Sequence, residues 1–169
     1  VVTVRHEQGA AFMADGYARA TGKPAAIIPL PGPGLTNAMT GIGEAFYDSS
    51  PMLVLATQVN RDYIDKGAGL LHEMTSQFEM LAPLTKHGER LRSGNDISVV
   101  FHRAMEVMHS GRPRPVQIEI DVAREVVVVL RLRRPEAVEG IELGDDRLVE
   151  DARRRQVVHH GARDLLLLA

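Results

Sequence analysis

Glu7 is the side chain in this sequence whose position points most directly to chemistry. A short β-rich stretch over residues 1–5 stops just before it, and a run of small residues that predicts a helix over residues 7–21 begins with it. In an open α/β sheet, ligands bind where strands end and helices begin. A carboxylate at such a junction can act as a proton switch for a cofactor, so we take Glu7 as the candidate catalytic residue.

The loop Gly32-Pro33-Gly34 is a second candidate for ligand contact. It lies between a strand predicted at residues 25–28 and a helix predicted at residues 36–48. Its lack of bulk would let a flat ring approach the backbone. Thr36 or Asn37 can cap the following helix. The alternative is an ordinary α/β turn, in which glycine and proline only shape the chain and Asn37 is only a cap.

The elements that must position these residues alternate along the chain. Strands are predicted at residues 1–5, 25–28, 52–56, 84–87, 116–120 and 163–169, and helices at residues 7–21, 36–48, 73–80, 95–110 and 147–158. Continuous apolar strands joined by helices predict an α/β fold, with a parallel sheet covered by helices on both faces. Residues 116–120 alternate, as a less buried strand does.

Composition excludes several classes of protein and site. The chain has 169 residues, a net charge of -2 and no cysteine. This charge argues against a nucleic-acid partner, and the missing thiols exclude disulfides and thiolate metal sites. No stretch is long and apolar enough for a membrane span, so we expect a cytoplasmic protein without a membrane partner. His72-Glu73 has no second ligand at helical spacing, so we expect no metal site.

Three runs, in this order and spacing, resemble one family. They are residues 5–19 (RHEQGAAFMADGYAR), residues 32–37 (GPGLTN) and residues 48–54, which lead from Asp48 through Pro51 into an apolar stretch. Over about residues 1–128 the chain resembles the N-terminal, pyrimidine-binding domain of thiamine-diphosphate-dependent enzymes. The nearest branch contains acetolactate synthases and related 2-oxo-acid decarboxylases. The first run is highly specific, whereas the Gly-Pro-Gly run alone is weak.

This resemblance implies a role for Glu7. It places the carboxyl group against a ring nitrogen of the cofactor's aminopyrimidine, in a dry pocket that raises its pKa and lets it share a proton with the ring. The activated ring would remove the proton from the thiazolium carbon. That carbon would then attack a 2-oxo acid, which loses carbon dioxide. The reaction implied is decarboxylation with carboligation, as in acetolactate synthase.

The resemblance also implies which residues surround the cofactor and the substrate. Cofactor contacts would come from Gly32, Pro33, Gly34 and Asn37. The active-site entrance would be lined by Gln58, Lys86 and His87, with Gln58 and Lys86 near the substrate. One departure concerns Leu30 and Pro31, because family members carry small hydroxyl residues just before the Gly-Pro-Gly run.

By the same resemblance the chain divides into a pyrimidine-binding domain (residues 1–128), a linker (129–144) and the start of a middle domain (145–169). The family domain begins with a helix and a strand that this sequence lacks, so we expect a fragment that is inactive alone. In the family, Mg²⁺ and the cofactor's diphosphate are bound by a separate domain with a Gly-Asp…Asn-Asn motif. We therefore expect a homodimer or homotetramer, with the 7–21 helix at its interface; ordinary packing within one chain is the alternative.

Two other functions stay open on the residues alone. One is a nucleotide- or phosphate-binding α/β module that uses the 32–34 loop, although the sequence has neither a G-x-G-x-x-G run nor a Walker lysine. The other is a non-catalytic domain that only makes subunit contacts. The sequence does not indicate which 2-oxo acid would be used, or whether a flavin binds.

Overall fold

A computed structural model describes residues 1–122 and 166–168, which form a five-stranded parallel sheet. The strand order is β3-β4-β2-β1-β5. The strands are β1 (Ala25–Ile27), β2 (Met52–Asn60), β3 (His87–Leu91), β4 (Val116–Val122) and β5 (Leu166–Leu168). Because all the pairs are parallel, the carboxyl ends of the strands share one edge of the sheet, which we call the carboxyl edge.

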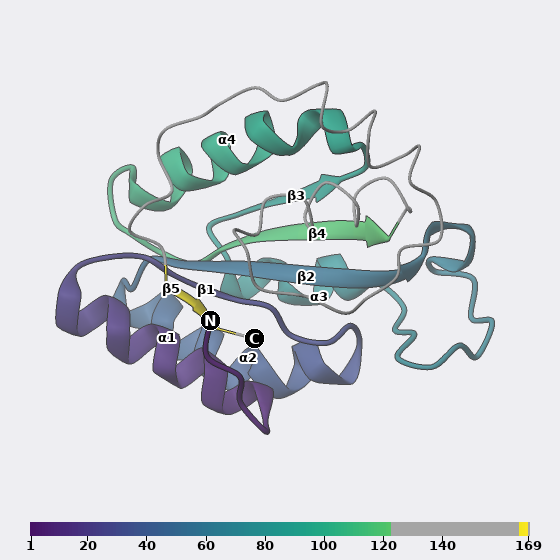
Figure 1. The fold of residues 1–169 in the computed structure, drawn as a ribbon, viewed down its shortest axis with the longest axis horizontal. Coiled ribbons are helices and arrows are strands. Elements are labelled where there is room, and N and C mark those ends of the chain that lie inside the picture. The colour runs from purple at the N-terminus through teal and green to yellow at the C-terminus, as the bar shows by residue number, and fades with distance from the viewer. Residues whose placement is uncertain (123–165, 169) are drawn as a thin grey trace, which may run out of the picture.

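Helices cover both faces of this sheet. They are α1 (Glu7–Thr21), α2 (Pro33–Asp48), α3 (Gln77–Leu81) and α4 (Ile97–His109). Figure 1 shows α1 and α2 on one face and α4 on the other. Successive side chains of β2 point to opposite faces of the sheet. Met52 packs in the apolar cluster with α1 and α2, and Leu53 packs in the cluster with α4. The predicted fold class, a parallel α/β sheet with helices on both faces, is confirmed.

The helices α1 and α2 run side by side in the same direction. Asn37 contacts Glu7 near the start of both helices, and Arg19 pairs with Asp48 at 2.7 Å near their ends. In between, a Cβ added to Gly41 would lie 2.6 Å from the Cβ of Ala11, so only glycine allows this close approach. Both helices therefore begin at the carboxyl edge, and their N-terminal ends lie together.

The expectation of a strand at residues 1–5 is wrong. Only Val2 makes an isolated bridge, and Glu7 follows an irregular segment. A strand requires a neighbour that satisfies its backbone groups. In the described part of the chain, the edge of β1 that faces away from β2 pairs instead with β5, with Ala26 opposite Leu167. This pairing agrees with the strand predicted at residues 163–169.

Element boundaries also differ from the predictions. The helix predicted at residues 36–48 begins at Pro33, because proline's fixed φ suits the first helical position, so the cap is Gly32 and not Thr36 or Asn37. The strand predicted to end at residue 56 continues to Asn60. The helix predicted at residues 73–80 is reduced to α3, and the strand predicted at residues 84–87 begins only at His87.

The strand at residues 116–120, predicted to be less buried than the others, is fully buried. β4 pairs with β2 on one side and β3 on the other, so its polar side chains are enclosed as well as its apolar ones. Gln117 and Glu119 are 1% and 0% exposed. The linker at residues 129–144 and the helix at 147–158 lie outside the described residues, and the domain boundaries stay predictions.

Candidate functional site

Glu7 is the first residue of α1, and its carboxylate faces the start of α2. His6 caps α1, with its Nδ1 accepting from the backbone N–H of Gln8 at 3.2 Å. Asn37 donates from its side-chain amide to Oε2 of Glu7 at 3.1 Å. The other oxygen, Oε1, lies 2.9 Å from where a Cβ on Gly34 would stand. The structure thus brings together Glu7, Gly34 and Asn37 from two helix N-terminal ends.

The electrostatics around Glu7 differ from the expectation. Its pKa is lowered, first by the hydrogen bond from Asn37 and then by a backbone hydrogen bond at Glu7 itself, with the positive potential of His6 and His72 in support. Burial works in the opposite direction and is the weaker effect, because Glu7 is half-buried and Asn37 is exposed. In the single chain the carboxylate is therefore not in a dry pocket and its pKa is not raised. A raised pKa in the site with cofactor and partner bound stays a prediction.

Gly32 occupies a position that only glycine fits. Its φ is 60°, in the left-handed region. A Cβ there would overlap the backbone carbonyl oxygen of His72, which closes over the loop. His72 itself has a φ of 65°, which is uncommon outside glycine. The predicted loop of Gly32-Pro33-Gly34 is consequently enclosed on one side and exposed at Pro33 on the other.

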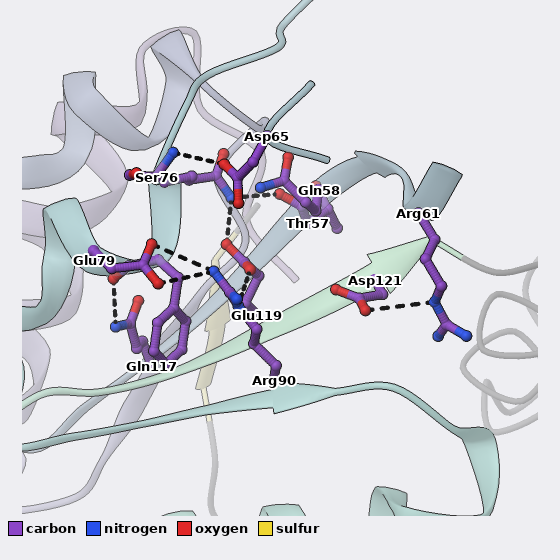
Figure 2. Close-up of polar contacts among 12 residues, drawn as sticks. Thr57, Gln58, Arg61, Asp65, Ser76, Glu79, Arg90, Gln117, Glu119 and Asp121 are labelled. Atoms are coloured by element: carbon purple, nitrogen blue, oxygen red, sulfur yellow. Dashed lines mark hydrogen bonds and ion pairs between the residues drawn. The ribbon is translucent and has the colours of Figure 1, made fainter. Parts of the chain in front are cut away.

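A buried polar network lies behind this loop, and sequence reasoning missed it. Gln77 is 0% exposed and accepts from the backbone N–H of Gly32 at 2.6 Å. Its amide nitrogen donates to the carbonyl of Thr57 at 3.0 Å and to Glu119 at 3.1 Å. Glu119 also accepts from Nε of Arg90 at 2.9 Å (Figure 2). Burial raises the pKa of Glu119, against the lowering effects of Gln77 and Arg90.

The structure does not bring Gln58 or Lys86 to Glu7 within one chain. Gln58 is buried in β2, where its Oε1 accepts from the adjacent N–H of Val59 at 2.9 Å. Lys86 lies at the opposite, amino edge of the sheet, where its ammonium group donates to the carbonyls of Ser110 and Arg112. His87 opens β3 at the same edge. Contact of these residues with a substrate stays a prediction.

A separate cavity of about 420 Å³ lies at the carboxyl ends of β2, β3 and β4. It is lined by Arg61, Ile64, Arg90, Arg92 and Asp121. Neither Glu7 nor the Gly32 loop contributes to it. Over the described residues, no three acidic or histidine side chains are placed to hold a metal ion, and no helix has the length and apolar character needed to cross a membrane.

The parallel sheet, with a carboxylate at its carboxyl edge, defines an α/β domain of the class in which ligands bind at that edge. Residues 1–80 match the family described as thiamine pyrophosphate enzyme, N-terminal TPP binding domain. The chain is also similar to enzymes whose names fall in the acetolactate synthase and decarboxylase branch. Residues 1–80 are therefore similar to the N-terminal thiamine pyrophosphate-binding domains of this family, and the resemblance predicted from the sequence runs is confirmed.

Three curated relatives illustrate the branch. A probable 2-ketoarginine decarboxylase of Pseudomonas aeruginosa is 46% identical over 119 residues, which are 70% of this chain and 21% of the relative. The acetolactate synthase large subunit of Buchnera aphidicola is 40% identical over 119 residues, 70% of this chain and 20% of the relative. That of Lactococcus lactis is 36% identical over 134 residues, 79% and 23% respectively. The chain thus spans about a fifth of the length of these relatives.

Proposed function

We propose that this chain is the pyrimidine-binding part of a thiamine-diphosphate-dependent enzyme that decarboxylates a 2-oxo acid and joins the product to a second carbonyl compound. The observation that carries the proposal is the carboxylate of Glu7 at the start of α1, oriented by Asn37 at 3.1 Å and fronting Gly34. The names of the relatives, a 2-ketoarginine decarboxylase and acetolactate synthases, support a 2-oxo acid as the substrate.

The residues present fit the cofactor's flat aminopyrimidine. Gly34 lets the backbone at the start of α2 approach the carboxylate closely, because a Cβ there would lie 2.7 Å from the Cβ of Leu30 and 2.9 Å from Oε1 of Glu7. The loop side chain of Leu30 and the neighbouring Leu71 are 55% and 82% exposed, and they leave apolar surface uncovered around the loop. A ring, together with a neighbouring subunit, would cover that surface.

Bound thiamine diphosphate supplies an acidic thiazolium carbon and an electron sink. The task of Glu7 is then to hold a proton at its carboxyl group and share it with the ring nitrogen. In the single chain the lowered pKa keeps Glu7 ionised near neutral pH. Covering the site removes water from the carboxylate, which raises the pKa towards the range in which Glu7 can carry that proton.

The proposal is tested by titrating thiamine diphosphate into the full-length protein by calorimetry, with and without Mg²⁺. We expect saturable binding that requires Mg²⁺, because the diphosphate would be bound through the metal by another part of the protein. ATP is the matched control ligand and should not compete. Failure of thiamine diphosphate to bind, or its displacement by ATP, would instead favour the nucleotide-binding alternative.

Assembly into a homodimer or homotetramer through α1 is part of the same proposal. Phe12 and Met13 are 43% and 45% exposed on this helix. Replacing Phe12 with glutamate in the full-length protein should weaken self-association by about a hundredfold, since a charge would replace an apolar contact. Val99→Glu is the control, because Val99 is 57% exposed on α4, on the opposite face. Analytical ultracentrifugation showing equal self-association for both variants would exclude α1 as the interface.

A further inference from the structure

We propose that Gln77 is a positioning residue that fixes the Gly32 loop, and with it the wall facing Glu7, through its hydrogen bonds to Gly32 and Glu119. This inference rests on the proposed function, because the loop matters for catalysis only if it contacts the cofactor. No catalytic contact is assigned to Gln77 itself.

The side chain of Gln77 connects three segments of the fold. Its carbonyl oxygen accepts from the N–H of Gly32 at 2.6 Å, 45 residues away in the sequence. Its amide nitrogen donates to the carbonyl of Thr57 in β2 and to Glu119 in β4, at 3.0 and 3.1 Å. With the side chain 0% exposed, no water competes for these bonds. The position of the loop relative to the sheet is thereby set by one amide group.

Only one orientation of that amide satisfies its partners. Rotating the amide by half a turn would direct its NH₂ group at the N–H of Gly32 and its oxygen at two acceptors, Thr57 and Glu119. Buried donors facing donors, and acceptors facing acceptors, lose their hydrogen bonds without replacement by water. Glu119 strengthens this selection because a carboxylate accepts and cannot donate while it is ionised.

Glu119 is in turn held from the outer side of the sheet. Arg90 of β3 donates to it at 2.9 Å, and the same guanidinium pairs with Glu79 at 3.1 Å and lies 4.7 Å from the ring centre of Phe78. Figure 2 shows the guanidinium of Arg90 between Glu79 and Glu119. A chain of contacts therefore runs from β3 through Glu119 and Gln77 to the start of α2.

Gln117 shows that burial of a glutamine in this region does not by itself make it a positioning residue. It is 1% exposed in β4, and it reaches the same helix by donating to the carbonyl of Phe78 at 3.0 Å. Its carbonyl oxygen has no hydrogen-bond partner, and none of its described contacts reaches the loop. Gln117 is therefore the matched control for Gln77, with the same chemistry and burial.

Gln77 controls the distance between Gly34 and the carboxylate of Glu7, and this distance is short. Gly34 stands two residues after Gly32, and the gap between it and Oε1 of Glu7 is already too small for a methyl group. A shift of the loop would therefore either press Gly34 on the carboxylate or withdraw it from the ring. Either change would reduce the affinity for thiamine diphosphate and the rate at which Glu7 exchanges its proton.

The experiment uses the full-length protein with four variants, Gln77→Glu, Glu119→Gln, the double variant and Gln117→Glu. Gln77→Glu removes the donor to Thr57 and puts two carboxylates in contact. The double variant restores a donor–acceptor pair between positions 77 and 119 and keeps the acceptor for Gly32, but the carbonyl of Thr57 still lacks its donor. We expect Gln77→Glu to raise the Kd for thiamine diphosphate by at least about tenfold, because two buried hydrogen bonds are lost. The double variant should recover part of this loss. Gln117→Glu should lower the unfolding temperature but change the Kd by less than about twofold.

The readouts are the Kd by calorimetry with Mg²⁺ and the exchange rate of the thiazolium proton. Equal changes in Kd for Gln77→Glu and Gln117→Glu, or no recovery in the double variant, would overturn the inference. If Gln77→Glu does not fold, Glu119→Gln decides, because the new amide has one acceptor oxygen for the two donors Gln77 and Arg90. An affinity at least about threefold weaker supports the inference, and unchanged affinity contradicts it. Wild-type protein that binds no thiamine diphosphate would instead overturn the proposed function.

Discussion

Glu7→Gln in the full-length protein is expected to slow exchange of the thiazolium proton of bound thiamine diphosphate by about 100- to 10,000-fold, the range typical of a lost general acid–base group. The amide can still accept from Asn37, so the contact between α1 and α2 is retained. An amide does not hold and release a proton near neutral pH, so the ring loses its exchange partner. The fold and the binding of the cofactor should change little.

The exchange rate is measured by NMR after acid quenching of the deuterated complex. Glu44→Gln is the matched control, because Glu44 is an exposed glutamate on α2. Calorimetry on both variants separates loss of binding from loss of proton transfer. Unchanged proton exchange in Glu7→Gln, with the cofactor bound, would remove Glu7 from the mechanism.

The pH dependence of the same rate reports the ionisation of Glu7. In the single chain the hydrogen bond from Asn37 holds the pKa of Glu7 below its usual value, so the carboxylate is ionised at neutral pH. If the cofactor and a neighbouring subunit cover Glu7 as proposed, that pKa rises, because burial penalises the charged form. The wild-type profile should then show an ionisation shifted upwards, and the Glu7→Gln profile should lack it.

Periodicity and composition were sufficient to predict the elements that are fixed by local sequence. The helix predicted at residues 7–21 matches α1, and the amphipathic run at residues 95–110 matches α4. The apolar run at Met52 to Ala56 lies within β2. In these segments the local pattern of apolar residues and the buried face agree, so nothing in the tertiary structure overrides them.

Features that depend on distant partners could not be predicted in this way. Residues 1–5 have β-type composition but form no strand, because strand formation requires a neighbour and not only propensity. Alternation in β4 suggested a less buried strand, whereas Glu119 is buried and accepts hydrogen bonds from Gln77, 42 residues away, and from Arg90. The Gln-x-Glu pattern at residues 117–119 was the available signal, but it does not identify the residues that these side chains contact.

In the candidate site, too, some residues could be predicted from the sequence and others could not. The family motif selected Glu7, Gly34 and Asn37, which do lie together. It gave no indication of His72 or Gln77, because their contacts with the loop involve a backbone carbonyl and a buried amide from a segment with no regular pattern. The environment of Glu7 was also not readable from the sequence, since the pKa depends on what covers the carboxylate in the assembled protein.

Gly32→Ala is expected to have the largest effect on stability, with a loss of about 3 kcal/mol in the local free energy of unfolding. Two causes add together. The φ of 60° is unfavourable for alanine, and the new Cβ would overlap the carbonyl oxygen of His72, which is backbone and yields little. The loop would have to move away from Gln77 and break the 2.6 Å hydrogen bond to Gly32.

Gly22→Ala separates these two causes. Gly22 has a φ of 69°, at the end of α1, and a Cβ there meets nothing within 4 Å. In this variant the local free energy of unfolding should fall by about 1 kcal/mol, from the backbone conformation alone. Native-state hydrogen exchange of the amides in β2 and β4 of the full-length protein measures both values, and calorimetry measures the Kd for thiamine diphosphate. Only Gly32→Ala should weaken cofactor binding, because only its loop faces Glu7. Equal losses for the two variants would mean that the carbonyl of His72 does not confine the loop.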